Sequence, residues 1–243
     1  MSSDNGAVKV VVLAGGKGTR LAPYTRIIPK PLMPIGDKPI LEILLRQFKH
    51  AGIKEVTLTV GYLADLLKLF FQDGSRLGLH ISYSYETKPL GTSGPLAYVE
   101  GLVDTFMVTN GDVLTTLDFA ELIAFHKKQG AIATIATHKR KVDINFGVVE
   151  LDGDHSLSGY SEKPTIDYLV SMGVYIFEPR ILDYIPKGEY LDLPDLIHRL
   201  IDSGEKVSGY VFRGYWEDLG RPDDYERANE YFEQMQDKFL PED

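Results

Sequence analysis

The sequence contains no cysteine and no long hydrophobic run, and these two absences exclude several kinds of protein. Without Cys among its 243 residues, the chain has no disulfide bond, no thiolate catalysis and no cysteine-ligated zinc. No apolar run approaches the roughly 20 residues of a membrane-spanning helix. The formal net charge of −9 disfavours nonspecific binding to nucleic acid or anionic membranes, because the overall field repels polyanions. We therefore expect a cytoplasmic protein that binds neither.

One segment, in contrast, lacks acidic residues. No Asp or Glu lies between Asp4 and Asp37. The same segment holds five cations: Lys9, Lys17, Arg20, Arg26 and Lys30. Positive charge is thus concentrated locally in a chain that is negative as a whole, which favours an anionic ligand at this place.

The alternation of predicted strands and helices is typical of an α/β sheet. The run from Val8 to Leu13 is apolar and β-branched, as in a strand buried on both faces. Asp118 is predicted to cap a helix, with Glu121 as its capping-box partner. Helices are predicted over residues 40–48, 63–71, 118–129 and 222–236 and near Pro194, and strands over 8–13, 56–60, 81–85, 132–137, 147–151, 157–160 and 174–177 and from Phe106.

Length and composition favour one large domain. With 44% hydrophobic and 25% charged residues, a chain of this length can bury a full core. We predict a flexible N-terminal tail over residues 1–6, a single domain over 7–236 and a polar C-terminal tail over 237–243. The second half is rich in predicted strands, so we expect it to form a lobe of that domain.

A glycine-rich turn follows the first strand. Gly15, Gly16 and Gly18 let backbone N–H groups approach a polyphosphate closely. A Walker loop, G-x-x-x-x-G-K-S/T, is disfavoured because Gly18 follows Lys17, and a dinucleotide fingerprint because Leu21 replaces its third glycine. Nearby prolines also argue against a long helix after this turn: Pro23, Pro29, Pro31 and Pro34.

The segment as a whole resembles the signature of the sugar-1-phosphate nucleotidylyltransferases, LAGGxGTRLxPxT, KPLxPI and KP. The matching residues are Leu13-Ala14-Gly15-Gly16-Lys17-Gly18-Thr19-Arg20-Leu21, Pro23, Thr25, Lys30-Pro31-Leu32, Pro34-Ile35 and Lys38-Pro39. The resemblance implies a Rossmann-like, GT-A-like mixed sheet that is mainly parallel, with helices on both faces and a small strand-rich sugar-binding lobe. It makes residues 7–236 the nucleotidyltransferase domain.

Two distant carboxylates match the family's metal ligands. Asp112 ends an apolar strand that begins at Phe106, although an Asp in such a turn is more often structural. Asp218 lies in Tyr215-Trp216-Glu217-Asp218-Leu219-Gly220, which resembles the motif W-x-D-I-G. By this resemblance Asp112 and Asp218 would hold Mg²⁺, a hard ion bound through carboxylates and substrate phosphates.

The sugar side is predicted from motifs in the second half. Glu162-Lys163-Pro164 resembles the family's E-K-P element, which implies that Glu162 binds sugar hydroxyls and Lys163 the sugar phosphate. Gly147 would pass its backbone close to the sugar. Ser171 and Gly173 lie where the family commonly has Asn-Ala-Gly, so Ser171 lacks the amide that would bridge to the sugar.

The base-reading segment is predicted at residues 86–96. Its spelling, Pro89-Leu90-Gly91-Thr92-Ser93-Gly94-Pro95-Leu96, resembles that of mannose-1-phosphate guanylyltransferases more than the glutamine-containing equivalent of thymidylyltransferases, which favours GTP and a mannose- or heptose-type sugar. Many guanylyltransferases carry a C-terminal β-helix, which we do not expect after residue 236. The predicted nucleotide-binding residues are Leu13, Ala14, Gly15, Gly16, Lys17, Gly18, Thr19, Glu86, Pro89, Gly91, Thr92, Asn110 and Gly111.

The chemistry that the resemblance implies is in-line attack of a sugar 1-phosphate on the α-phosphorus of a nucleoside triphosphate. Because the attacking phosphate oxygen is already ionised, no general base is required; positioning and neutralisation of charge are needed instead, with Arg20, Lys30 and Asp112 as the predicted catalytic residues. Two alternatives stay open: a uridylyl- or thymidylyltransferase of glucose 1-phosphate or a related sugar, and a non-catalytic nucleotide-sugar sensor. The oligomeric state also stays open, with a homo-oligomer as one possibility. A GT-A glycosyltransferase is disfavoured because Asp112 is followed by Val113 and Leu114, not by a D-x-D motif.

Overall fold

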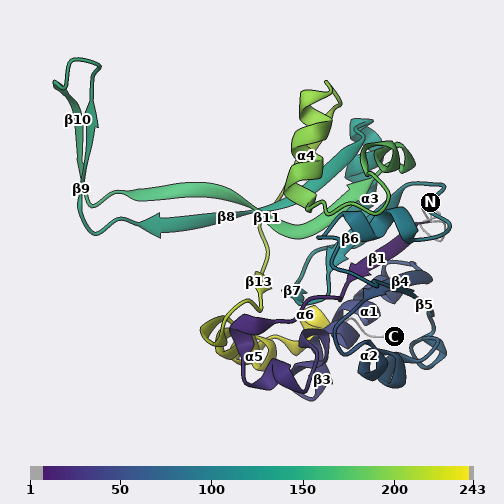
Figure 1. The fold of residues 1–243 in the computed structure, drawn as a ribbon. Coiled ribbons are helices and arrows are strands. Elements are labelled where there is room, and N and C mark those ends of the chain that lie inside the picture. The colour runs from purple at the N-terminus through teal and green to yellow at the C-terminus, as the bar shows by residue number, and fades with distance from the viewer. Residues whose placement is uncertain (1–7, 241–243) are drawn as a thin grey trace.

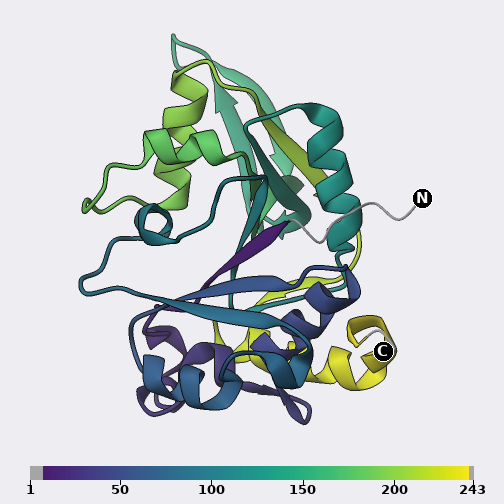
Figure 2. The same ribbon diagram turned by 90° about the vertical axis from the view of Figure 1, so that its right-hand side faces the viewer.

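A seven-stranded sheet organises residues 8–240, the part of the chain that the computed structural model describes (Figures 1 and 2). The strand order is β12-β8-β11-β6-β1-β4-β5. Only β11 runs antiparallel to its neighbours, β6 and β8; the other pairs are parallel. This confirms the predicted mixed, mainly parallel sheet. The strands are β1 (Lys9–Leu13), β4 (Glu55–Val60), β5 (His80–Tyr85), β6 (Phe106–Asn110), β8 (Ala133–Asp143), β11 (Thr165–Phe177) and β12 (Val207–Phe212).

Helices cover both faces of the sheet because its central strands are apolar on both sides. Val10 and Val12 of β1 join one core cluster, and Val11 joins the other. The first face carries α1 (Ile40–His50), α2 (Ala64–Phe71) and α3 (Phe119–Gln129), and the second carries η6 (Gly94–Tyr98), η7 (Pro179–Tyr184) and α4 (Leu193–Asp202). Asp118 caps α3 as predicted, since its carboxylate accepts a hydrogen bond from the Glu121 amide at 3.0 Å. Within residues 8–240, no helix is both long and apolar enough to cross a membrane.

The last two helices of the described chain pack against α1. Helices α5 (Pro222–Gln234) and α6 (Gln236–Phe239) form a third core cluster with Ile40 and Ile43 of α1. Phe239 is fully buried, and its carbonyl accepts a hydrogen bond from Gln47 at 3.0 Å. The predicted polar tail over 237–243 is therefore corrected for residues 237–240, because Phe239 supplies an apolar anchor. The predicted tail over 1–6 and residues 241–243 lie outside the described part.

Short elements complete the body. Most of them connect the glycine-rich turn to α1, one follows α2, and a strand pair joins the segment Trp216–Asp218 to the segment that follows β6. Their bounds are η2 (Thr19–Leu21), η3 (Tyr24–Arg26), η4 (Lys30–Leu32), β2 (Pro34–Ile35), β3 (Lys38–Pro39), η5 (Ser75–Leu77), β7 (Val113–Thr115) and β13 (Trp216–Asp218), with β2 paired to β3 and β7 to β13.

Strands β8 and β11 run far beyond the other strands and form an arm (Figure 1). Their ladder continues to the pair Asp143–Thr165, whereas the sequence predicts strands only over 132–137 and 174–177. The hairpin of β9 (Gly147–Leu151) and β10 (Leu157–Glu162) stands at the far end. No residue from 138 to 171 is buried. We call residues 138–171 the arm.

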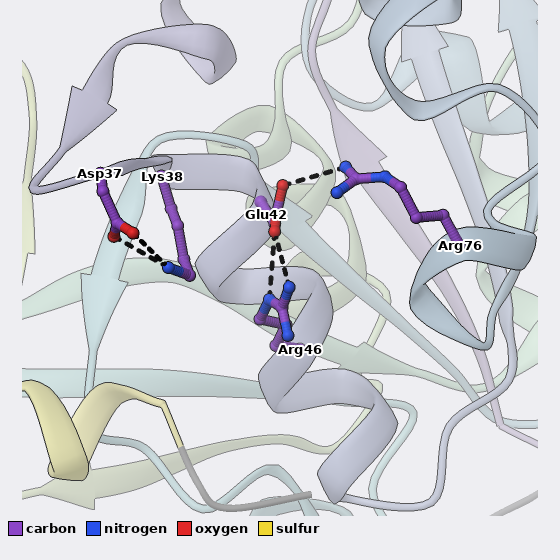
Figure 3. A network of polar contacts seen from close by, with 5 residues as sticks. All are labelled: Asp37, Lys38, Glu42, Arg46 and Arg76. Carbon is purple, nitrogen blue, oxygen red and sulfur yellow. Dashed lines mark hydrogen bonds and ion pairs between the residues drawn. The ribbon is translucent and has the colours of Figure 1, made fainter.

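A buried carboxylate ties α1 to the segment after α2 (Figure 3). Glu42 is almost inaccessible and accepts hydrogen bonds from Arg46 at 2.8 Å and from Arg76 of η5 at 3.0 Å. Burial alone would raise the pKa of Glu42, but the two guanidinium groups outweigh it and hold that pKa below its usual value. Nearby, Lys38 pairs with Asp37 in the exposed turn between β2 and β3.

We expect Glu42→Gln to lower the free energy of unfolding by about 2 kcal/mol at neutral pH, because a buried charge-assisted network is lost. A carboxylate whose pKa is lower in the folded than in the unfolded state stabilises the fold at pH values above its unfolded pKa. This stabilisation disappears as the pH falls through the pKa of the folded state. The difference in the free energy of unfolding between wild type and variant, measured by urea titration, should therefore become smaller towards about pH 4. Asp37→Asn, at an exposed pair, is the control and should change little; a difference for Glu42→Gln that does not depend on pH would contradict this account.

Candidate active site

The carboxyl ends of β1, β4 and β6 open into a cleft of about 760 Å³, the place where open α/β sheets bind ligands. The structure brings all predicted nucleotide-binding and catalytic residues to this cleft. Its lining includes Leu13, Ala14, Gly15, Gly16, Lys17, Gly18, Thr19, Arg20, Lys30, Glu86, Pro89, Gly91, Thr92, Asn110, Gly111 and Asp112. Their roles in binding and catalysis stay predictions.

The glycine-rich turn is held open by contacts within its own segment. Thr25 is buried, and its hydroxyl donates a hydrogen bond to the Gly18 carbonyl at 2.8 Å. The turn continues into three short 3-10 helices rather than a long helix, as the prolines predict. Gly15 allows a close approach, because a Cβ there would lie 2.8 Å from Oε1 of Glu86. The turn and the Glu86 carboxylate therefore lie directly against each other in the lining of the cleft.

Lys30 lies between the two predicted metal ligands. Its Nζ contacts Oδ2 of Asp112 and lies 3.6 Å from Oδ1 of Asp218. Strand β13 pairs with β7 so that Asp218 is opposite Val113, which explains how residues far apart in sequence meet. Arg20 is close by, because a Cβ on Gly220 would lie 3.2 Å from Nη1 of Arg20 and 3.3 Å from Oδ2 of Asp218.

The two carboxylates have the properties of a cation site. Burial, and then the charge of Asp112, raise the pKa of Asp218. Oδ1 of Asp112 is buried without a hydrogen-bond partner, so it is free to coordinate a metal ion or to accept a hydrogen bond from a metal-bound water. No group of three or more His, Cys, Asp or Glu residues suited to a metal occurs within residues 8–240. These two residues fit a hard divalent ion, whose remaining ligands would be phosphate oxygens and water.

The predicted sugar-binding residues are divided between the cleft and the arm. Gly173 borders the cleft, since a Cβ there would lie 2.5 Å from the Asn110 amide nitrogen. Ser171 lies at the base of the arm, where its hydroxyl is 2.9 Å from Oη of Tyr175. The structure does not bring Gly147, Glu162 or Lys163 to the cleft; they are exposed at the far end of the arm (Figure 1).

Sequence reasoning missed a second wall of the cleft. Asp192 accepts hydrogen bonds from the Thr92 amide at 3.0 Å and from its hydroxyl at 3.2 Å, and Tyr190 donates to Asp192 at 2.8 Å. Asp192 precedes α4 and looks like an N-cap, but its side chain makes no capping bond. Only the Asp-Leu-Pro spelling could have drawn attention to it. Thr59 and Gly61 are further lining residues that the sequence analysis did not predict.

Comparison with known proteins identifies the family. The model of the nucleotidyl transferase family matches residues 9–235. The UTP–glucose-1-phosphate uridylyltransferase of Synechocystis sp. is 37% identical over 241 residues, which covers 91% of this chain and 62% of that protein. The mannose-1-phosphate guanylyltransferase of Mycobacterium tuberculosis is 39% identical over 229 residues, with 91% and 64% covered.

A solved structure agrees with the sequence relatives. HddC from Yersinia pseudotuberculosis, complexed with GMP-PN, is 26% identical, covers 93% of this chain and 99% of its own, and superposes with a TM-score of 0.71. The chain spans less than two thirds of the length of the two curated relatives. The resemblance seen in the sequence is confirmed at the level of the family: the chain belongs to the nucleotidyl transferases.

Proposed function

We propose that the protein transfers a nucleoside monophosphate from a nucleoside triphosphate to a sugar 1-phosphate and releases pyrophosphate. The observation that carries this proposal is the cleft, in which a glycine-rich turn with Arg20 and Lys30 faces the carboxylates of Asp112 and Asp218. The names of the relatives from Synechocystis and Mycobacterium support it, since both are sugar-1-phosphate nucleotidylyltransferases. The nucleotidyltransferase domain is then residues 7–236, and the cytoplasmic location stays a prediction.

In this reaction an oxygen of the sugar 1-phosphate attacks the α-phosphorus, the new P–O bond forms, and the bond to the β-phosphate breaks. The pyrophosphate leaves with the bonding electrons. In this proposal Arg20 would form a bidentate contact with the departing pyrophosphate, and Lys30 would neutralise charge near the α-phosphate. Asp112 and Asp218 would hold a divalent cation, proposed to be Mg²⁺, which supplies further charge neutralisation when bound. The ionised nucleophile needs no general base, which agrees with a cleft that no histidine lines.

Glu86 supports GTP as the nucleotide. Its carboxylate faces Gly15 in the cleft, and an ionised carboxylate can only accept hydrogen bonds. Guanine offers two adjacent donors, N1–H and the 2-amino group, whereas uracil and thymine offer one donor between two acceptors. Burial raises the pKa of Glu86, although the hydrogen bond from the Leu90 amide opposes this, and donors on a bound base would further favour the ionised carboxylate. HddC, solved with GMP-PN, agrees with this choice.

A uridylyltransferase of glucose 1-phosphate is the second candidate. The Synechocystis relative, which bears that name, matches 91% of this chain at 37% identity.

For the sugar we propose a mannose or heptose type. Ser171 is shorter than the family's usual Asn and is already engaged by Tyr175, so this wall of the site offers less to a sugar hydroxyl.

We expect pyrophosphate release only when a nucleoside triphosphate and a sugar 1-phosphate are both present. A matrix of triphosphates against sugar 1-phosphates, read by a coupled pyrophosphate assay, measures this and ranks the substrates. Chelation by EDTA should abolish release and excess Mg²⁺ should restore it. Release that persists in EDTA would contradict the assignment of Asp112 and Asp218, and binding without turnover would indicate a sensor instead.

Arg20→Ala and Lys30→Ala should each lower turnover by more than about a hundredfold, because each removes a charge that stabilises the transition state. Circular dichroism and the melting temperature report whether the fold is intact. Arg26→Ala is the matched control, since Arg26 belongs to the same acid-free segment but does not line the cleft. Near-normal turnover of either cleft variant would refute the assignment.

Glu86→Gln should change the base preference. We expect the ratio of kcat/KM for GTP over UTP to fall by about tenfold or more, since an amide can pair with the donor and acceptor of uracil. Glu55→Gln, at the opposite end of the sheet, is the control and should leave the ratio unchanged. An unaltered ratio in Glu86→Gln would place base recognition elsewhere.

A further inference from the structure

The hairpin at the end of the arm presents an exposed apolar face. In its register Tyr160 lies opposite Val149 and Glu162 opposite Gly147, so these residues share one face. Patches of this kind mark interaction sites on soluble proteins. The large apolar side chains of this face are all more than half exposed: Val149, Leu151, Leu157 and Tyr160. We call this the hairpin face.

Glu162 is held in place at the edge of the hairpin face, and Lys163 follows it with an unusual backbone conformation. The Tyr160 hydroxyl donates a hydrogen bond to Oε2 of Glu162 at 2.7 Å. Gly147 makes room for that ring, since a Cβ there would lie 2.3 Å from the Tyr160 oxygen. Lys163 has φ 46°, a conformation that non-glycine residues seldom adopt and that is concentrated at functional sites. The arm thus carries an organised polar edge beside an uncovered apolar face.

The arm does not reach the cleft of its own chain. Strand β11 begins at Thr165, near the far end of the arm, and reaches the border of the cleft at Gly173. These two residues are roughly 25 Å apart along the strand, at about 3.3 Å per residue. The base of the arm is fixed to β13, because Trp216 donates to the Met172 carbonyl at 3.0 Å and Arg140 lies 5.0 Å above the Trp216 ring. No residue from 138 to 171 lines the cleft.

We propose that the arm packs on a second copy of this chain, and that Glu162 and Lys163 of each copy complete the sugar-phosphate side of the other copy's cleft. The inference rests on the proposed function. In a single chain, Glu162 and Lys163 do not line the cleft that would bind the triphosphate. Both residues are exposed on the arm, where no cleft of the same chain lies beside them. A two-fold exchange between identical chains satisfies both needs and also covers the hairpin face.

Complementation between two inactive variants tests this exchange. Arg20→Ala disables the cleft and Lys163→Ala disables the arm, so each variant alone should be inactive. Co-expressed with different tags, they should recover about one quarter of wild-type pyrophosphate release, because half of the random dimers are mixed and one of their two sites is intact. If each arm served its own cleft, every site would carry one defect and no activity would return. That outcome, or full activity of Lys163→Ala alone, would overturn the proposal.

A second measurement does not depend on turnover. Light scattering of the wild type should give twice the chain mass of 27.2 kDa. Val149→Asp on the hairpin face should give the single mass, whereas Ser161→Asp, whose residue is paired with Val148 on the opposite face, should stay dimeric. A monomeric wild type, or a dimer that Val149→Asp does not disturb, would overturn the exchange. A dimeric wild type that releases no pyrophosphate with any substrate pair would refute the proposed function alone.

Discussion

The contact of Lys30 with Asp112 and Asp218 joins three segments that are far apart in the chain. Lys30 comes from the segment after the glycine-rich turn, Asp112 from the end of β6, and Asp218 from β13. Each segment has its own anchor. The segment of Lys30 follows β1, Asp112 directly follows β6, and the strand that holds Asp218 pairs with β7. Two carboxylates thus face the ammonium group of Lys30, and the guanidinium group of Arg20 lies beside Asp218, so both negative charges have a cation nearby.

Elements with a strong local signal were predictable from the sequence. The β-branched run of β1 and the glycines after it gave the strand and the turn, and Asp112 follows an equally apolar strand. These signals are local, because burial on both faces and a turn with close backbone approach each demand particular residue types. Most residues that line the cleft near the glycine-rich turn and the end of β6 could therefore be predicted from these local signals.

The arm and the second wall of the cleft were less predictable. From Lys139 to Asp143 the sequence is mostly charged, so nothing in its periodicity indicates a strand; the ladder to β11 holds it there. Asp192 looks like a helix cap, and only the folded chain shows that its carboxylate binds Thr92. Phe239 is a lone aromatic in a polar stretch, and its burial depends on α1 and α5. All three are determined by long-range contacts.

The lack of any buried residue in the arm also determines how the molecule opens. Backbone hydrogen bonds and a few surface contacts maintain the arm, such as that of Thr165 with Asp143, whereas two large cores maintain the body. A two-stranded ribbon without a core is only marginally stable by itself, so in a chain whose arm has no partner the amide protons of the arm should exchange with solvent through local opening that leaves the body folded. In a single chain the arm and the body are therefore separate units of local stability, and a protease acting near the turn at 152–156 would cut such a chain while the cleft at the carboxyl ends of β1, β4 and β6 remains intact.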